Sequence, residues 1–181
     1  MSLRPSWDKY FLNMCDIIST RSLDENTKLG CVIVNDNHRI VSTGYNSLPA
    51  KVNDELWPMS RDLKLPIAKN MPTGELLILN DGDFPALRTE WDETEFSVSK
   101  YDVVVHAEAN AICSAAALGV STQGCTLYCT YLPCHDCAKL VISAGIKKVV
   151  YIKENPRFEK SHAIAKEMFE QAKVICEHYG E

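Results

Sequence analysis

From about residue 125 the sequence alternates short apolar runs with helical patterns, and this alternation constrains the fold more than any other feature. Strand-like runs at residues 125–131, 146–152 and 173–178 are separated by helical patterns that begin near Pro133 and near Phe158. A strand that returns to the same sheet through a helix normally pairs in parallel, with a right-handed crossover. This part of the chain therefore predicts parallel strands with helices packed against them.

The preceding residues add helices and a hairpin to this pattern. Apolar residues recur at helical spacing over residues 6–19, and a second helix is expected over about 106–118. Residues 29–34 form a continuous apolar run, and Asp36-Asn37 provides a turn into a second run at 39–45. The fold class expected from the whole pattern is α/β, as a three-layer α/β/α arrangement around a five-stranded mixed sheet.

Length and charge limit the classes of protein to which the chain can belong. Its 181 residues are enough for one compact domain, and we expect a single domain over residues 1–181. The net charge is −5 and the densest basic spot is only Lys147-Lys148, so long nucleic acid is not expected as a partner. No run approaches the ~20 apolar residues of a membrane span, and residues 1–11 lack the apolar segment of a signal peptide. We therefore expect a cytoplasmic protein without a membrane partner.

Residues 49–100 differ in character from the rest of the chain. They contain five of the eight prolines and many acidic residues, and they show no sustained periodicity. A stretch of this length without regular structure is usually functional or flexible. We expect an irregular insertion at about residues 51–100, with one short strand near residues 75–79.

The eight cysteines divide into two groups. A chain of this length, rich in core residues, does not resemble a small disulfide scaffold, and clustered cysteine and histidine in a reducing compartment indicate metal binding or catalysis. Six cysteines lie in apolar runs and are predicted to be small buried hydrophobic residues; these are Cys15, Cys31, Cys113, Cys125, Cys129 and Cys176. The remaining two belong to a separate motif.

Two short motifs contain the residues suited to chemistry, His106-Ala107-Glu108 and Pro133-Cys134-His135-Asp136-Cys137. Each is weak alone, because a C-x-x-C pair can be a redox pair and a histidine at a helix start can be a cap or a core residue. Together they match H-x-E…P-C-x-x-C, which is typical of zinc deaminases. Each also lies where a strand passes into a helix, and a helix N-terminus stabilises thiolates. We predict a Zn²⁺ site with His106, Cys134 and Cys137 as ligands.

Glu108 is the predicted catalytic residue of this site. Three protein ligands leave the fourth zinc position to water, which is typical of a catalytic site. Two thiolates cancel the formal charge of zinc, so the water needs a nearby base, and Glu108 can lie over the metal without binding it. The alternative is a structural zinc site with an incidental glutamate. Such a site would need a fourth cysteine or histidine, and His135 is poorly placed for this because it adjoins Cys134.

These motifs and the sequence around them resemble the deoxycytidylate (dCMP) deaminase family of the cytidine deaminase superfamily. The resemblance covers most of the chain outside residues 51–100. It rests on Arg21-Ser22-x-Asp24, Thr27–Val34, Gly44-Tyr45-Asn46, His106–Ile112, Pro133–Lys139 and Ala144–Tyr151. It implies hydrolytic deamination of dCMP to dUMP, in which a zinc-activated water attacks C4 of the cytosine ring, Glu108 moves the protons and ammonia leaves.

The resemblance also implies residues that contact the substrate. Asn46 is expected to contact the sugar and Ala107 the bound nucleotide, and Arg21 is a candidate for the 5′-phosphate because arginine can bind it bidentately. Asn46 can equally be a turn residue, and Arg21 a solvated residue that closes the first helix, so both interpretations stay open. Further candidates are Lys100, Tyr101 and Arg61.

Other functions and partners remain open on this basis. The same chemistry could act on a modified dCMP, dCTP, a free nucleoside or adenosine in tRNA, although the acidic net charge argues against tRNA. A non-enzymatic alternative is an inactive zinc-binding interaction module. The presence of Glu108 argues against this alternative. The resemblance further implies a homo-oligomer and dCTP or dTTP as effectors. Relatives that bind such effectors often have Gly-Tyr-Asn-Gly, whereas Ser47 takes the last place here.

Overall fold

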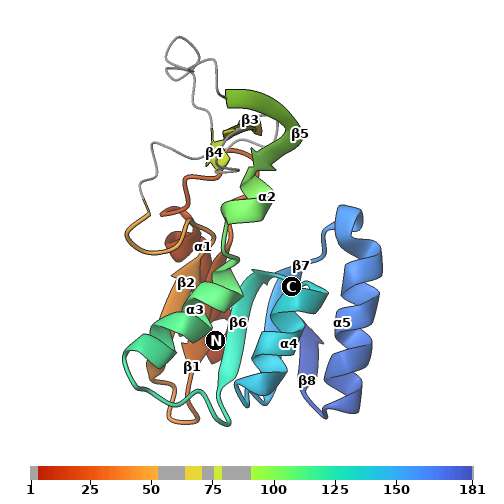
Figure 1. The fold of residues 1–181 in the computed structure, drawn as a ribbon. Helices are drawn as coiled ribbons and strands as arrows, with labels where there is room; N and C mark the ends of the chain where they lie inside the picture. The colour runs from red at the N-terminus through yellow and green to blue at the C-terminus, as the bar shows by residue number, and fades with distance from the viewer. Residues whose placement is uncertain (1–3, 53–63, 71–75, 79–90, 181) are drawn as a thin grey trace. The chain divides into compact units, whose positions relative to one another are not determined.

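The computed structural model describes residues 4–52, 64–70, 76–78 and 91–180, which fall into two compact units (Figure 1). The first unit comprises Met1–Leu23, Thr27–Ser47 and Val105–Glu181, and the second comprises Asp24–Asn26 and Leu48–Val104. The single-domain organisation stays a prediction, and each unit is described by itself.

The first unit is built on a five-stranded mixed sheet with the strand order β2-β1-β6-β7-β8. Its strands are β1 (Gly30–Val34), β2 (Ile40–Tyr45), β6 (Thr126–Tyr131), β7 (Lys148–Lys153) and β8 (Ile175–His178). Strand β1 pairs antiparallel with both β2 and β6, whereas β6, β7 and β8 run parallel to one another. The predicted α/β fold with a five-stranded mixed sheet is confirmed.

Helices cover both faces of this sheet. They are α1 (Trp7–Ser19), α3 (Ala107–Ala117), α4 (His135–Ser143) and α5 (Glu159–Gln171), and the short 3₁₀ helix η3 (Pro156–Phe158) precedes α5. Successive side chains of a strand point to opposite faces. Accordingly, Val32 of β1 packs with Phe11 of α1, while the neighbouring Ile33 packs in the core shared with α3, α4 and α5.

The second unit contains a three-stranded antiparallel sheet with the order β4-β3-β5, followed by the one-turn helix α2 (Lys100–Val103). The strands are β3 (Lys64–Asn70), β4 (Leu76–Ile78) and β5 (Trp91–Ser99). The short strand expected near residues 75–79 corresponds to β4, but β3 and β5 lie in a stretch that we expected to be irregular. Pro66 explains part of this difference, because proline cannot donate to a ladder and argues against a strand. Here the β3–β5 register shifts between Pro66 and Ala68, and β4 pairs only with Ile67–Lys69.

Four of the six cysteines predicted to be buried are buried, namely Cys15, Cys31, Cys125 and Cys129. Cys176 is partly buried, and the prediction is wrong for Cys113, which is exposed on α3. The helix turns its small residues Ala107, Ala111 and Ala115 to the core at a spacing of four, which places Cys113 on the opposite side. In the part of the chain that the structure describes, no helix is long and apolar enough to cross a membrane.

Candidate metal and active site

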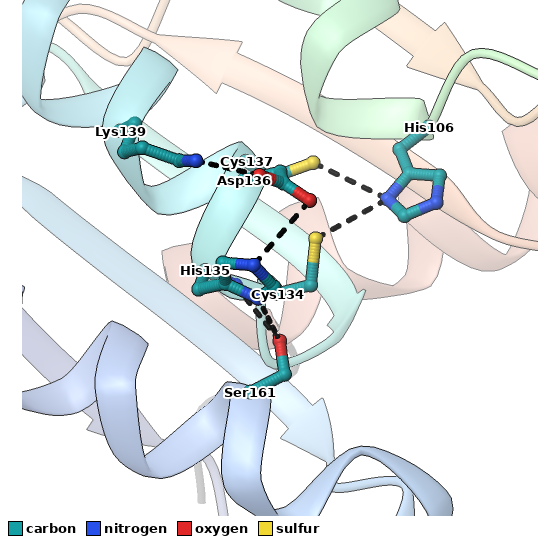
Figure 2. A network of polar contacts seen from close by, with 7 residues as sticks. All are labelled: His106, Cys134, His135, Asp136, Cys137, Lys139 and Ser161. Atoms are coloured by element: carbon teal, nitrogen blue, oxygen red, sulfur yellow. Dashed lines mark hydrogen bonds and ion pairs between the residues drawn. The ribbon is translucent and has the colours of Figure 1, made fainter.

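Two helix N-termini of the first unit bring the predicted ligands together. His106 is the residue immediately before α3, and Cys134 is the residue immediately before α4, with Cys137 in the first turn of α4. The Sγ atoms of Cys134 and Cys137 each lie 3.4 Å from Nδ1 of His106. The three ligand atoms lie within 4.8 Å of one another, and Figure 2 shows both sulfurs turned toward the imidazole.

The local backbone explains why these side chains converge. His106 and Cys134 both have extended backbone angles, and neither side chain caps its own helix. A residue at this position usually turns its side chain back to the first N–H groups of the helix. Here both side chains turn away from their helices and toward each other.

The donor set fits a zinc ion. Zinc bonds of ~2.3 Å to sulfur and ~2.0–2.1 Å to nitrogen in a tetrahedron imply a sulfur–nitrogen separation of about 3.6 Å. The two observed separations of 3.4 Å are close to this value. One imidazole and two thiolates are ligands that zinc favours, and three protein ligands leave one position for water or substrate.

The pKa of each of the three predicted ligands depends on its contacts with neighbouring groups of the site. A hydrogen bond from Cys137 and a second from His106 lower the pKa of the Cys134 thiol to about 4, despite its burial. The hydrogen bond with Cys134 in turn raises the pKa of His106 to about 9. The pKa of Cys137 is raised, because this thiol donates to Cys134 and is buried beside Glu108. A bound dication deprotonates coordinating thiols outright, so these residues can present two thiolates to zinc.

Glu108 is the second residue of α3 and is only 5% exposed. Its Oε2 lies 3.6 Å from Sγ of Cys137, next to the ligand cluster but outside it. Burial raises the pKa of Glu108, because the charged carboxylate loses its hydration. A carboxyl group in this position can accept a proton and return it, which is what a general acid–base residue does.

His135 does not approach the cluster. Its Nδ1 lies 2.7 Å from Oγ of Ser161 on α5, and its Nε2 lies 3.6 Å from a carboxylate oxygen of Asp136 (Figure 2). This orientation agrees with the sequence argument that His135 is poorly placed as a fourth ligand. Among the described residues, His106, Cys134 and Cys137 are the group able to hold a metal ion.

Asn46 is buried, and its side chain is held by the backbone of the preceding loop. Its Oδ1 accepts from the N–H of Leu29 at 2.7 Å, and its Nδ2 donates to the carbonyl of Thr27 at 2.9 Å. These bonds support the interpretation of Asn46 as a turn residue. The expected contact with the sugar stays a prediction.

The other predicted substrate residues have different surroundings. Ala107 is buried between His106 and Glu108 at the start of α3. Arg21 is exposed just after α1, where its N–H donates to the carbonyl of Ile18 at 3.1 Å and closes the helix. Neither position tests the expected contact with the nucleotide.

The three further candidates for a substrate contact also differ in their surroundings. Lys100 is buried, with its Nζ 2.6 Å from a carboxylate oxygen of Asp24, so its charge is already neutralised. Tyr101 is exposed, and Arg61 lies outside the described residues. The ion pair makes Lys100 a poor candidate for a phosphate contact.

One residue that supports the site was not anticipated from the sequence. Nδ2 of Asn110 on α3 donates to the carbonyl of Tyr45 at 2.8 Å and to Oγ of Ser47 at 3.1 Å. The first helical turn after His106 is thereby tied to the end of β2. Asn110 lies in the His106–Ile112 stretch of the family resemblance, four residues after a ligand, but neither signal reveals a partner more than sixty residues away.

Comparison with known proteins gives one family. The family described as "Cytidine and deoxycytidylate deaminase zinc-binding region" matches residues 5–153. A probable deoxycytidylate deaminase of Drosophila melanogaster is 33% identical over 168 residues, which cover 93% of this chain and 70% of that protein. The deoxycytidylate deaminase of Homo sapiens is 32% identical over 168 residues, with 93% and 76% covered.

A solved structure shows the same fold. The dCMP deaminase of cyanophage S-TIM5, in complex with dCMP and dUMP, aligns with a TM-score of 0.63 at 24% identity, over 98% of this chain and all of that chain. At this level of identity the likeness concerns the fold alone.

Proposed function

The chain belongs to the cytidine and deoxycytidylate deaminase family, and from this premise we propose that it hydrolyses dCMP to dUMP and ammonia with the help of zinc. The observation that carries the proposal is the cluster of His106, Cys134 and Cys137 with the buried carboxyl of Glu108 beside it. The curated relatives named as deoxycytidylate deaminases support dCMP as the substrate, because the similarity extends over more than nine tenths of this chain.

In this reaction His106, Cys134 and Cys137 would hold the zinc ion, which when bound would supply Lewis-acid activation of a water molecule as the nucleophile. Glu108 takes the proton of the attacking water and passes it to N3 of the ring as the C4–O bond forms. It then takes the second proton of the former water and delivers it to the amino group at C4. The C4–N bond breaks, and the products are dUMP and ammonia.

The position of Glu108 supports this role. It follows His106 by two residues on the same helix turn, and its burial keeps bulk water away from the protons it moves. Since its Oε2 lies outside the ligand cluster, the carboxyl group is available for proton transfer.

We assign recognition of the nucleotide to Asn46, Ala107 and Arg21. The hydroxyl of Ser22, next to Arg21, donates to the backbone carbonyl of Asn46 at 2.8 Å, so the loop that carries Arg21 is hydrogen-bonded to Asn46. We propose that Asn46 contacts the sugar and Arg21 the 5′-phosphate. Because the side chain of Ala107 is buried in the core, its contact with the base would come from its backbone.

Assembly and control are also part of the proposal. A cytoplasmic location suits a site made of two thiols in a chain whose eight cysteines are all free. A homo-oligomer, and control by dCTP or dTTP, follow from the family resemblance. Ser47 occupies the place where effector-binding relatives often have glycine, and its hydroxyl already accepts from Asn110.

An ammonia-release assay tests the activity. The purified zinc protein is assayed on dCMP, 5-methyl-dCMP, dCTP and deoxycytidine, and dCMP should give the highest kcat/KM. Glu108→Gln should keep the zinc and the fold yet lose kcat by about 10²–10⁴-fold or more, because it cannot move protons. If the loss is only a few-fold, another group moves the protons. If zinc is bound but no cytosine compound is turned over, the inactive binding module becomes the better hypothesis.

A further inference from the structure

Helix α4 begins without a cap of its own. Cys134 occupies the position from which a side chain usually accepts the first N–H groups, but its sulfur is turned to His106. The N–H groups at the start of a helix have no partner within the helix and need acceptors from elsewhere. With Cys134 used as a ligand, the N–H of His135 at the start of α4 depends on an acceptor from another part of the chain.

Ser161 on α5 supplies such an acceptor. Its Oγ lies 3.0 Å from the backbone N of His135, the first residue of α4, and 2.7 Å from Nδ1 of the same residue (Figure 2). A hydroxyl group has one proton and two lone pairs, so it can accept from the amide and donate to Nδ1 at the same time. One side chain thus holds both the backbone and the ring of the residue that follows Cys134.

The far side of the imidazole completes the arrangement. Nε2 of the same ring lies 3.6 Å from a carboxylate oxygen of Asp136. The other carboxylate oxygen of Asp136 lies 2.6 Å from Nζ of Lys139 one turn further along α4. Val141 of α4 and Phe169 of α5 belong to the same buried core. Ser161 therefore lies on a helix that is fixed by packing.

We propose that Ser161 is a positioning residue for the metal site, which caps α4 from α5 and holds the turn from Cys134 to Cys137 in its ligating arrangement. The proposal rests on the zinc site of the proposed function but not on its substrate. Without the Ser161 hydroxyl the N–H of His135 loses its acceptor, and the turn that sets the separation of the two sulfurs from His106 is held less firmly. Groups that orient metal ligands typically change metal affinity by about 10–100-fold.

Zinc affinity of the full-length protein, measured by competition with a chromogenic chelator, tests the proposal. Ser161→Ala should bind zinc about 10–100-fold more weakly than the wild type. Ser161→Thr should recover most of the affinity because it keeps the hydroxyl. Ser143→Ala is the matched control, since Ser143 is exposed at the other end of α4 and should bind zinc as the wild type does.

Thermal unfolding of the chelator-treated proteins separates positioning from a purely structural role. A lower unfolding midpoint for Ser161→Ala, with zinc affinity equal to that of the wild type, would overturn the proposal. If Ser161→Ala does not fold, His135→Asn removes the ring contact and keeps the amide contact, and it should still weaken zinc binding. Equal zinc affinity of His135→Asn and the wild type would then count against the proposal. A wild type that turns over no nucleotide, while Ser161→Ala binds zinc more weakly, would refute the substrate but leave the role of Ser161 standing.

Discussion

Arg21 is an exposed cation in the loop that also holds Asn46, through the bond from Ser22 to the Asn46 carbonyl. A charge-assisted hydrogen bond contributes about 1.5–3 kcal/mol, so loss of a phosphate contact should cost roughly 10–100-fold in kcat/KM. Arg21→Ala should therefore lower kcat/KM for dCMP by this factor and leave deoxycytidine turnover unchanged.

The control for Arg21 is Arg39→Ala. Arg39 precedes β2 and Asn46 follows it, so the length of this strand separates the exposed Arg39 from Asn46. Steady-state kinetics on dCMP and deoxycytidine should distinguish the two variants. Equal losses on both substrates would show that Arg21 does not recognise the phosphate.

His162 is a buried histidine on α5 that should make stability depend on pH. Burial lowers its pKa, and the nearby Lys166 acts in the same direction, while Glu154 opposes it. In the unfolded chain a histidine has a pKa of about 6.5, so below that pH the unfolded state binds the proton more readily than the folded state. This contribution to stability is complete above about pH 6.5 and is lost as the pH falls toward the lowered pKa of the folded state.

A comparison with His162→Leu isolates this effect. Urea unfolding at several pH values between 5.5 and 7.5 should show a steeper loss of stability on acidification for the wild type than for the variant. Parallel pH profiles would mean that His162 titrates alike in the folded and unfolded states.

At the level of single residues the sequence predicts site residues that belong to short motifs. It does not predict contacts between residues that are distant in the sequence. His106, Cys134, Cys137 and Glu108 were predictable because metal chemistry demands those residue types at those intervals. The bond from the N–H of His135 to Ser161 and the pair of Lys100 with Asp24 join residues 26 and 76 positions apart. No local pattern encodes either contact.

Helix α3 begins directly after the ligand His106 and contains Glu108 in its first turn. Its close approach to the sheet depends on Gly44 in β2. A Cβ at Gly44 would overlap the carbonyl oxygen of Ala107 and the amide nitrogen of Ala111, both in the backbone of α3. Backbone cannot yield as a flexible side chain can, so Gly44→Ala should push away the turn that carries Glu108. We expect a loss of about 1–3 kcal/mol of stability, typical of overpacking, together with a lower kcat.

Gly180→Ala is the control for this substitution, because a Cβ there meets no atom within 4 Å. Chemical unfolding and dCMP turnover should both be unaffected in the control and reduced in Gly44→Ala. Wild-type stability and kcat in Gly44→Ala would show that α3 can move without disturbing the site.

The elements of the first unit were predictable because each has a strong period, and the helix and strand bounds differ from expectation by only a few residues. Strands β3 and β5 were not anticipated, since Pro66 interrupts one run and acidic residues fill much of the other. These strands form because each pairs with a neighbouring strand. Local propensity alone is a weak guide to strand formation.

At the scale of the whole molecule, the helical crossovers predicted the parallel half of the sheet and the turn at Asp36-Asn37 predicted the hairpin. The pairing of β1 with β6 joins residues almost a hundred positions apart, as in Cys31 opposite Cys129. This pairing unites the two halves, and so it places the helix that follows His106 and the helix that follows Cys134 on one face of the same sheet.

Zinc should therefore stabilise the fold as well as support the reaction, because its ligands come from the N-termini of two helices that pack on that face. A ligand present at 100 times its Kd adds about 2.7 kcal/mol to the free energy of unfolding if it binds only the folded state. For a chain of this size that corresponds to roughly 5–11 °C in Tm. Treatment with a strong chelator should lower Tm by this amount, and added zinc should restore it. Cys134→Ala supplies the control, because it has lost a ligand and its Tm should respond to neither treatment. An equal fall in Tm for this variant would place the chelator effect outside the His106, Cys134 and Cys137 site.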